Sequence, residues 1–245
     1  MRIANPVVVA VAAAAAATLA IPPAAADGPG YKYFKSRGSA KKPGAYWNPC
    51  AVVTYGIDYT YAQRVGMRKR WERQRWQSAI AEVSQTLGVT FRYQGAVKTK
   101  SVRAHPRTSS PVDVVITFGN AKARGKYGYR KVLKGQIAGY TRIRWRGTSR
   151  KGRYRITSAN IVIDAKQVSR FTDVWQSAPD IRPARERTPD LLRTLYIHEF
   201  GHAVGLDHVR DKHQIMYPQL QSDRPDTLGS GDRKGLRRMG QQPCF

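Results

Sequence analysis

The chain has 245 residues, and 41% of them are hydrophobic, which is enough for a packed core and excludes a wholly disordered polypeptide. It is strongly basic, because 43 Lys and Arg against 16 Asp and Glu give a formal net charge of +27. Two cysteines are too few for a disulfide-rich scaffold or for a zinc finger built on cysteines. The length suits one ordinary domain, or at most two small ones.

Residues 1–26 have the pattern of a secretory signal peptide. Arg2 precedes a long uncharged, alanine-rich stretch, Pro22 and Pro23 break any helix, and three alanines then offer small residues for cleavage before Asp27. An uncleaved anchor is the alternative, because the uncharged stretch is long enough to span a bilayer. We expect cleavage, a secreted or extracellular protein that could associate with the cell wall, and no transmembrane segment in the mature chain.

The segment that follows is rich in Gly, Pro, Lys and Ser, which predicts a flexible leader over residues 27–45 and a single domain over residues 46–245. Within the domain, runs of β-branched and aromatic residues predict strands, and one apolar stripe with spacings of four, three and four residues predicts a helix. In chain order we expect a strand at 52–59, a helix at 67–87, strands at 89–93, 112–118, 136–145 and 155–164, a helix opening at Thr188-Pro189 and ending near 204, and a loop-rich C-terminal part.

The most specific stretch of the chain begins at His198 and Glu199. At 100° per residue, His198 and His202 lie about 40° apart on one face of a helix, so both imidazoles can bind one Zn²⁺ ion. Glu199 lies about 60° from His202 on the helical wheel, beside the metal and not on it. Its carboxylate is therefore predicted to accept a proton from metal-bound water.

A glycine three residues after the second histidine completes the pattern. Gly205 can take a positive φ, end the helix and reverse the chain, which allows His208 to return as a third ligand. Three neutral imidazoles leave the fourth position of zinc open for water, and an open position indicates a catalytic site and not a structural one.

These residues resemble the zinc-binding motif of the metzincin peptidases, in which a methionine turn follows the third histidine. Here Met216 follows His208 by eight residues, and the string Met-Tyr-Pro is most similar to the matrixins. The resemblance implies an α+β fold with a twisted mixed β-sheet, an active-site helix that carries the first two histidines, and a loop-rich C-terminal subdomain with the Met-turn. It also implies that Met216 forms an apolar floor beneath the zinc.

The resemblance further implies where substrate binds. The wall after the turn, at Tyr217 and Pro218, would border the substrate side-chain pocket. An edge strand of the sheet would pair with the main chain of an extended substrate, and Ile137, Ala138 and Gly139 are the candidates for it. An ordinary edge strand without this role is the alternative.

Three features depart from better-known matrixins. Val209 follows the third histidine, which leaves the subfamily open. Between Glu82 and Asp164 the only acidic residue is Asp113, so we do not expect calcium sites in that stretch. The cysteine switch of matrixin propeptides is also missing.

The two cysteines are expected to have a structural role. An exported protein meets an oxidising environment, which predicts a disulfide between Cys50 and Cys244. The alternative is that Cys50 is an inhibitory thiolate ligand of the metal.

The sequence therefore predicts a monomeric zinc endopeptidase that acts on protein or peptide substrates with one catalytic Zn²⁺ ion.

From residue 114 to residue 163 there are 13 Lys and Arg and no acid, which indicates either a solvated basic surface or a surface that binds an anionic cell-surface polymer. We expect no specific nucleic-acid binding, because no DNA-binding motif is visible. Two alternatives remain open: an exported module that binds a polyanion or the cell wall and carries a non-catalytic zinc site, and a zinc hydrolase that acts on cell-wall peptides.

Overall fold

The computed structural model describes residues 30–34, 43–99, 112–148, 153–172, 190–220 and 226–245. The expected signal peptide at 1–26 and the helix opening at Thr188-Pro189 lie outside these residues. The elements in chain order are β1 (Lys32–Tyr33), β2 (Ala45–Tyr46), β3 (Val53–Asp58), α1 (Thr60–Arg64), α2 (Lys69–Leu87), β4 (Phe91–Ala96), β5 (Val114–Gly119), a 3₁₀ turn (Gly125–Tyr127), β6 (Gly139–Thr148), β7 (Arg153–Asp164), α3 (Ala165–Thr172), α4 (Leu191–Val204), β8 (Leu206–Asp207) and α5 (Ser230–Gly240).

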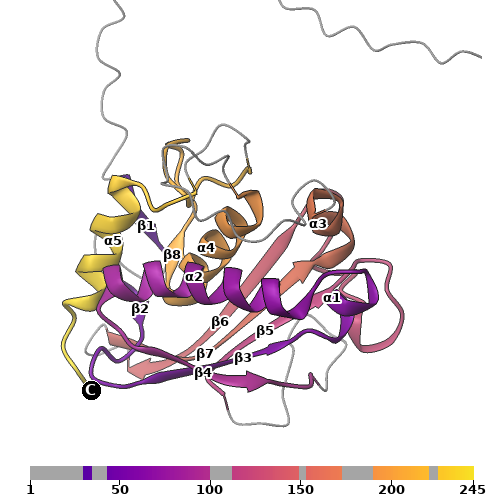
Figure 1. Ribbon diagram of the computed structural model, residues 1–245. Coiled ribbons are helices and arrows are strands. Elements are labelled where there is room, and N and C mark those ends of the chain that lie inside the picture. Colours follow the sequence, from indigo (N-terminus) through magenta and orange to yellow (C-terminus); the bar gives the residue numbers. More distant parts are fainter. Residues whose placement is uncertain (1–29, 35–42, 100–111, 149–152, 173–189, 221–225) are drawn as a thin grey trace, which may run out of the picture.

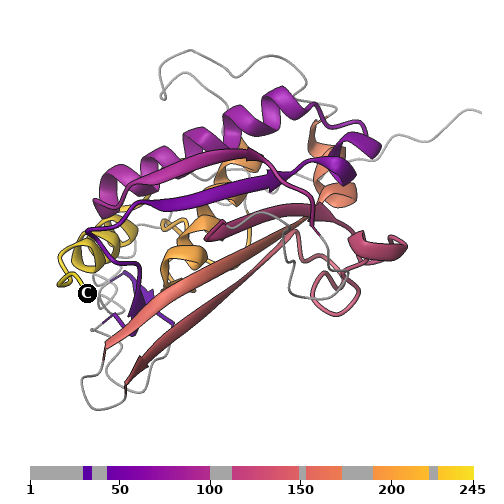
Figure 2. The same cartoon turned by 90° about the horizontal axis from the view of Figure 1, so that it is seen from below.

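One six-stranded mixed sheet forms the centre of the fold. Strands β2, β7, β5, β3 and β4 are neighbours in that order and pair in parallel, while β6 pairs with β7 in the antiparallel direction. Helices α2 and α4 lie over the same face of this sheet (Figure 1). Strands β6 and β7 form its longest hairpin, with β6 on the outside (Figure 2). The α+β fold with a mixed sheet is thus confirmed.

The core between the sheet and the helices is aromatic where α2 meets α4. Trp76 of α2 stacks on Tyr196 of α4 with ring centroids 4.2 Å apart, and both rings are buried. The other apolar residues of the predicted α2 stripe, Ile80, Val83 and Leu87, are buried as well. Gly88 ends this helix with a φ of 78°, as the sequence predicts for a glycine after the last helical turn.

Residues 30–34 and 43–45, which belong to the segment expected as a flexible leader, pack against the rest of the described structure. Tyr31 and Tyr33 are buried, and β1 pairs with β8, the short strand that directly follows α4. The Tyr33 hydroxyl donates to the carbonyl of Gly235, and Lys32 forms an ion pair with Asp207 at 2.7 Å. Tyrosines within a Gly- and Lys-rich segment therefore act as anchors, because each ring buries a large apolar surface.

The C-terminal part contains a helix, α5, that the expectation of a loop-rich region misses. Glycine lowers helix propensity, and α5 contains three glycines in eleven residues. The packing explains all three: a Cβ at Gly231 would overlap with the backbone of Gly30, one at Gly235 would lie 2.9 Å from the Cβ of Tyr31, and one at Gly240 would overlap with the carbonyl group of Leu87. The close approach of α5 to the N-terminal strand therefore requires residues that weaken the local helix signal.

The structure contains the expected disulfide between Cys50 and Cys244. Nearby, the side-chain amide of Asn48 donates to a terminal oxygen of Phe245, so the two ends of the domain meet at this point. A sulfur in this bond is not available as a metal ligand, which excludes the alternative role for Cys50. None of the helices in the described residues is long and apolar enough to cross a membrane.

Candidate metal centre

The helix that carries the first two histidines is held at both ends. Asp190 caps its N-terminus, because the side chain accepts hydrogen bonds from the amides of Leu192 and Arg193 at 3.0 and 3.1 Å. The same carboxylate pairs with the buried Arg75 of α2 at 3.1 Å. Asp190 is therefore the N-cap of α4, and its second contact ties the start of α4 to α2.

Gly205 ends α4 as the spacing predicts. Its φ is 114°, in the left-handed region, and its amide donates to the carbonyls of Gly201 and His202. A Cβ at this position would lie 2.8 Å from the carbonyl oxygen of Ala45. The chain then reverses through β8 and brings His208 back over the helix.

Three imidazoles converge at this reversal. The Nε2 atom of His208 lies 3.2 Å from that of His198 and 3.0 Å from that of His202. In the described part of the chain, these three residues are the group whose ligand atoms lie close enough together to hold a metal ion. His198 and His202 are buried and His208 is exposed, so the cluster opens to solvent on one side.

The hydrogen bonds of the buried histidines suit metal binding. The Nδ1 atoms of His198 and His202 lie 2.7 and 2.8 Å from the carbonyl oxygens of Ile215 and Leu206. A carbonyl accepts only from a protonated nitrogen, so Nε2 of each ring keeps its lone pair for a metal. Burial also lowers the pKa of His202 to about 4 and lowers that of His208, which keeps both rings neutral at pH 7. The donor set fits Zn²⁺ bound by three neutral imidazoles.

Glu199 lies next to this cluster without belonging to it. The hydroxyl of Thr141 donates to Oε2 of Glu199 at 2.5 Å and also lies 3.0 Å from its carbonyl oxygen. A Cβ at Gly139 would lie 2.7 Å from Cδ of Glu199, so this glycine leaves the space that the carboxyl group occupies. Burial raises the pKa of Glu199 to about 7, although the bond from Thr141 lowers it.

Met216 is where a floor beneath the histidines is expected. Its side chain is buried, and a Cβ at Gly201 would overlap with its sulfur, so the methionine packs closely against the backbone of α4 between the two histidines. The residue before it, Ile215, supplies the carbonyl that accepts from His198. The turn therefore contacts both the helix and one of its histidines.

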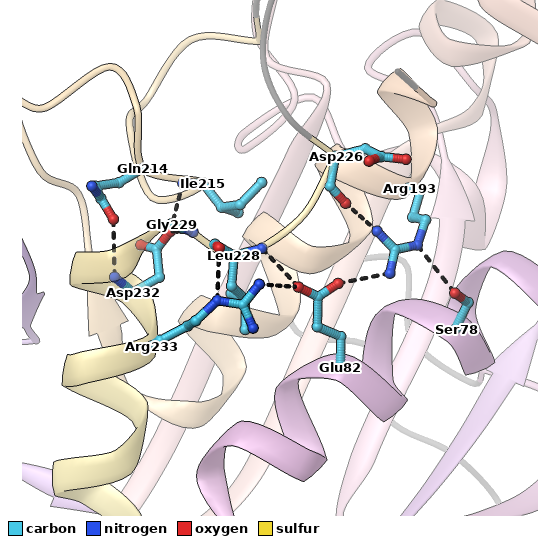
Figure 3. A network of polar contacts seen from close by, with 10 residues as sticks. All are labelled: Ser78, Glu82, Arg193, Gln214, Ile215, Asp226, Leu228, Gly229, Asp232 and Arg233. Atoms are coloured by element: carbon cyan, nitrogen blue, oxygen red, sulfur yellow. Dashed lines mark hydrogen bonds and ion pairs between the residues drawn. The ribbon is translucent and has the colours of Figure 1, made fainter. Parts of the chain in front are cut away.

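Helix α5 holds the Met-turn in place. The buried Asp232 accepts hydrogen bonds at Oδ2 from the amides of Ile215 and Gly229, at 2.7 and 3.0 Å, and Gln214 accepts from the amide of Asp232 (Figure 3). Gln214 also accepts from the amide of Gly231. Asp232 thus reaches His198 through a single residue, Ile215.

A second set of contacts joins α2, α4 and α5. Glu82 pairs with Arg193 of α4 at 2.7 Å and with Arg233 of α5 at 3.5 Å, and it accepts from the amide of Leu228 (Figure 3). Arg193 also donates to the carbonyl of Asp226. The three helices that support the histidines therefore share one carboxylate.

Compared with known protein families, residues 46–239 match the family described as Matrixin. The chain is a matrixin. This confirms the metzincin resemblance that the histidine spacing and Met216 indicate, and membership in the family supports a metallopeptidase. A comparison with curated proteins finds no match.

The substrate-pocket candidates of this matrixin lie on two segments. Tyr217 and Pro218 follow the Met-turn and are half-buried and exposed, respectively. Ile137 and Ala138 precede β6 and are not part of it, whereas Gly139 is its first residue. Ile137 is 44% exposed, and the carbonyl of Ala138 accepts from the amide of Asp164. Gly139 lies directly against the side chain of Glu199, as the space for its absent Cβ shows.

Three residues at the centre were missed by reasoning from the sequence: Thr141, Gly201 and Asp232. Gly201 lies inside the motif, where a glycine in a helix is itself a signal of close packing. Thr141 and Asp232 give no local signal, because each meets the motif only through the tertiary fold.

Proposed function

We propose that this matrixin is a secreted zinc metalloendopeptidase that hydrolyses internal peptide bonds. The single observation that carries the proposal is the convergence of the three Nε2 atoms at a helix that also carries the buried Glu199, which is not part of the group that could hold the metal. His198, His202 and His208 would hold the zinc ion, and zinc in such a site lowers the pKa of a bound water and polarises a carbonyl group.

Glu199 supplies the general base. The hydroxyl of Thr141 holds Oε2, which leaves Oε1, on the side of Gly139, as the atom that accepts the proton from the attacking water. The same oxygen then returns the proton to the nitrogen of the leaving amine. Gly139 is the first residue of the edge strand β6. A substrate that pairs with β6 therefore passes the carboxyl group of Glu199 where the strand begins.

Export is the second part of the proposal. The signal-peptide pattern predicts cleavage before Asp27, and the disulfide between Cys50 and Cys244 supports an oxidising compartment. The first residue of the protein recovered from culture medium, measured by mass spectrometry, is expected to be Asp27. Recovery only with the cells, with residues 1–26 intact, would contradict this part.

The test of the activity uses the purified protein, an internally quenched peptide and elemental analysis. We expect about one zinc per chain, cleavage inside the peptide, loss of activity with a chelator and recovery with Zn²⁺. Glu199→Gln is expected to keep zinc and to lose nearly all activity, because only the proton acceptor is removed. His208→Ala is expected to lose zinc, whereas the exposed His213→Ala serves as the matched control. Normal turnover by Glu199→Gln would overturn the mechanism.

A further inference from the structure

The outer edge of β6 continues the active centre into a basic strand. Strand β6 starts at Gly139 and Thr141, which contact Glu199, and runs on through Arg142, Arg144 and Arg146. Among the described strands it pairs with β7 alone, so within the described residues its other edge has no strand partner and can pair with an added strand. Because β6 begins beside Glu199, this edge extends from Glu199 only toward the C-terminal end of the strand.

Arginines along this strand lie on a defined face. Thr141 and Ile143 point toward α4, because Thr141 bonds to Glu199 and Ile143 is buried in the core. Alternate residues of a strand point to opposite faces, so Arg142 and Arg144 lie on the face away from α4, opposite Asn160 and Ser158 of β7. A bulge between Arg144 and Trp145 ends this alternation.

The arginine side chains of this part of β6 carry positive charge at the protein surface. Arg142, Arg144 and Arg146 are exposed, and no ion pair joins Arg144 or Arg146 to a carboxylate within the part of the chain that the structure describes. A cavity of about 620 Å³ lies over the hairpin, and its lining includes Arg142, Arg144, Trp145, Arg146, Thr157 and Ser158. Guanidinium and hydroxyl groups together are donors that carboxylates bind.

We propose that this strand is an acidic-substrate subsite: it binds an extended segment of the substrate that carries Asp or Glu at alternate positions on one side of the scissile bond. Only a polypeptide satisfies both features of the site, because its amides pair with the free edge of β6 while its carboxylates meet Arg142 and Arg144. This inference rests on the proposed endopeptidase function and adds a preference to it.

The alternation makes the subsite testable at the level of single residues. A strand added to β6 presents every second side chain to the arginine face, and a shift of one residue turns the acids to the other face. We therefore design internally quenched peptides with one fixed neutral scissile bond and a pair of Asp residues at positions n and n+2. The pair is moved stepwise along the first six positions on either side of the bond, and kcat/KM is measured at low salt.

We expect kcat/KM to exceed that of the neutral parent peptide only when the Asp pair lies on one side of the scissile bond. On that side the increase is expected to alternate between successive positions of the pair, with a period of two residues. Two arginine contacts are expected to raise kcat/KM by at most about tenfold. The increase is expected to fall with added salt. In Arg142→Gln/Arg144→Gln the ratio of kcat/KM for the acidic to the neutral peptide is expected to approach one. In Arg70→Gln/Arg237→Gln, which removes two exposed charges of α2 and α5, the ratio is expected to stay as in the parent protein.

Zinc content and thermal unfolding establish that each variant is folded. Equal rates for acidic and neutral peptides, an increase on both sides without alternation, or a preference that survives in Arg142→Gln/Arg144→Gln would each overturn the subsite while the endopeptidase function stands. Failure to cleave any peptide, the neutral parent included, would instead overturn the proposed function, and the subsite with it.

Discussion

The amide N–H of Ile215 donates to Oδ2 of the buried Asp232 at 2.7 Å, and the carbonyl oxygen of the same Ile215 lies 2.7 Å from Nδ1 of His198. One residue of the Met-turn therefore links a carboxyl group of α5 to His198, a proposed metal ligand of α4. Groups that orient a ligating histidine contribute to metal affinity although they do not touch the metal.

Replacement of Asp232 by Ala is expected to weaken zinc binding by about tenfold or more, because Ile215 loses its anchor and His198 is held less firmly. The buried amide of Ile215 also loses its acceptor, which costs about 1–3 kcal/mol in the free energy of unfolding, and the half-buried amide of Gly229 loses its acceptor as well. Competition with a fluorescent chelator measures the zinc affinity.

Asp113→Ala is the matched control for this variant. Asp113 accepts at Oδ2 from the amide and the hydroxyl of Thr54, at 2.7 and 2.8 Å, in the sheet and away from the histidines. Asp113→Ala is expected to lower the free energy of unfolding and to leave the affinity for zinc unchanged. An equal loss of zinc affinity in both variants would mean that Asp232 acts through general stability alone.

Asp232 also predicts a pH dependence of stability. Burial raises the pKa of Asp232 to about 6, against the hydrogen bonds from the amides of Gly229 and Ile215, and the carboxylate of Asp211 adds to the rise. The unfolded chain has the ordinary pKa near 3.8, so between about pH 4 and pH 6 the folded state binds more protons. The contribution of Asp232 to the free energy of unfolding is thus present below about pH 4 and is lost as the pH rises to about 6.

The measurement is denaturant unfolding at steps of pH for the parent protein and for Asp232→Asn. The asparagine keeps an acceptor for the two amides and cannot ionise. We expect the difference between the two unfolding free energies to shift by about 3 kcal/mol across the window, in favour of the variant at higher pH. A constant difference from pH 4 to pH 7 would show that Asp232 titrates normally.

Thr141 is expected to position Glu199, the proposed general base. Thr141→Val keeps the shape of the side chain and removes the donor to Oε2 of Glu199, so kcat is expected to fall by about tenfold to a hundredfold with KM little changed. Thr141→Ser restores the hydroxyl and is expected to recover most of kcat. Steady-state kinetics on one peptide distinguish the two variants. Equal values of kcat for Thr141→Val and Thr141→Ser would show that the hydroxyl group does not position Glu199.

The disulfide closes almost the whole domain, because Cys50 and Cys244 are 194 residues apart. In the chain-entropy description, a loop of this length stabilises the folded state by about 5 kcal/mol. The double variant Cys50→Ala/Cys244→Ala is expected to lose up to this amount in denaturant unfolding and to retain the zinc site, which lies on other elements. Unchanged stability would indicate that packing of the termini, and not the covalent link, holds this end.

The strand and helix positions were largely predictable, because apolar spacing and glycine signals act over a few residues. Helix α2 and strands β3, β5 and β7 follow their predicted ranges within a few residues. Helix α5 and strand β1 were missed. The glycines of α5 and the polar residues around β1 weaken the local sequence signal, and both elements form because they pack against distant parts of the chain.

For the candidate metal centre, the sequence by itself determined the three histidines, Glu199, the reversal at Gly205 and the methionine eight residues later. Helical spacing and the conformational freedom of glycine are local properties that hold in any fold. Only the tertiary structure decided that Thr141 holds the carboxyl group of Glu199, that Asp232 anchors the turn, and that a basic edge strand leads away from the centre. These contacts join residues 58 and 17 positions apart and depend on how β6 and α5 pack beside α4 and the Met-turn, which no short-range pattern encodes.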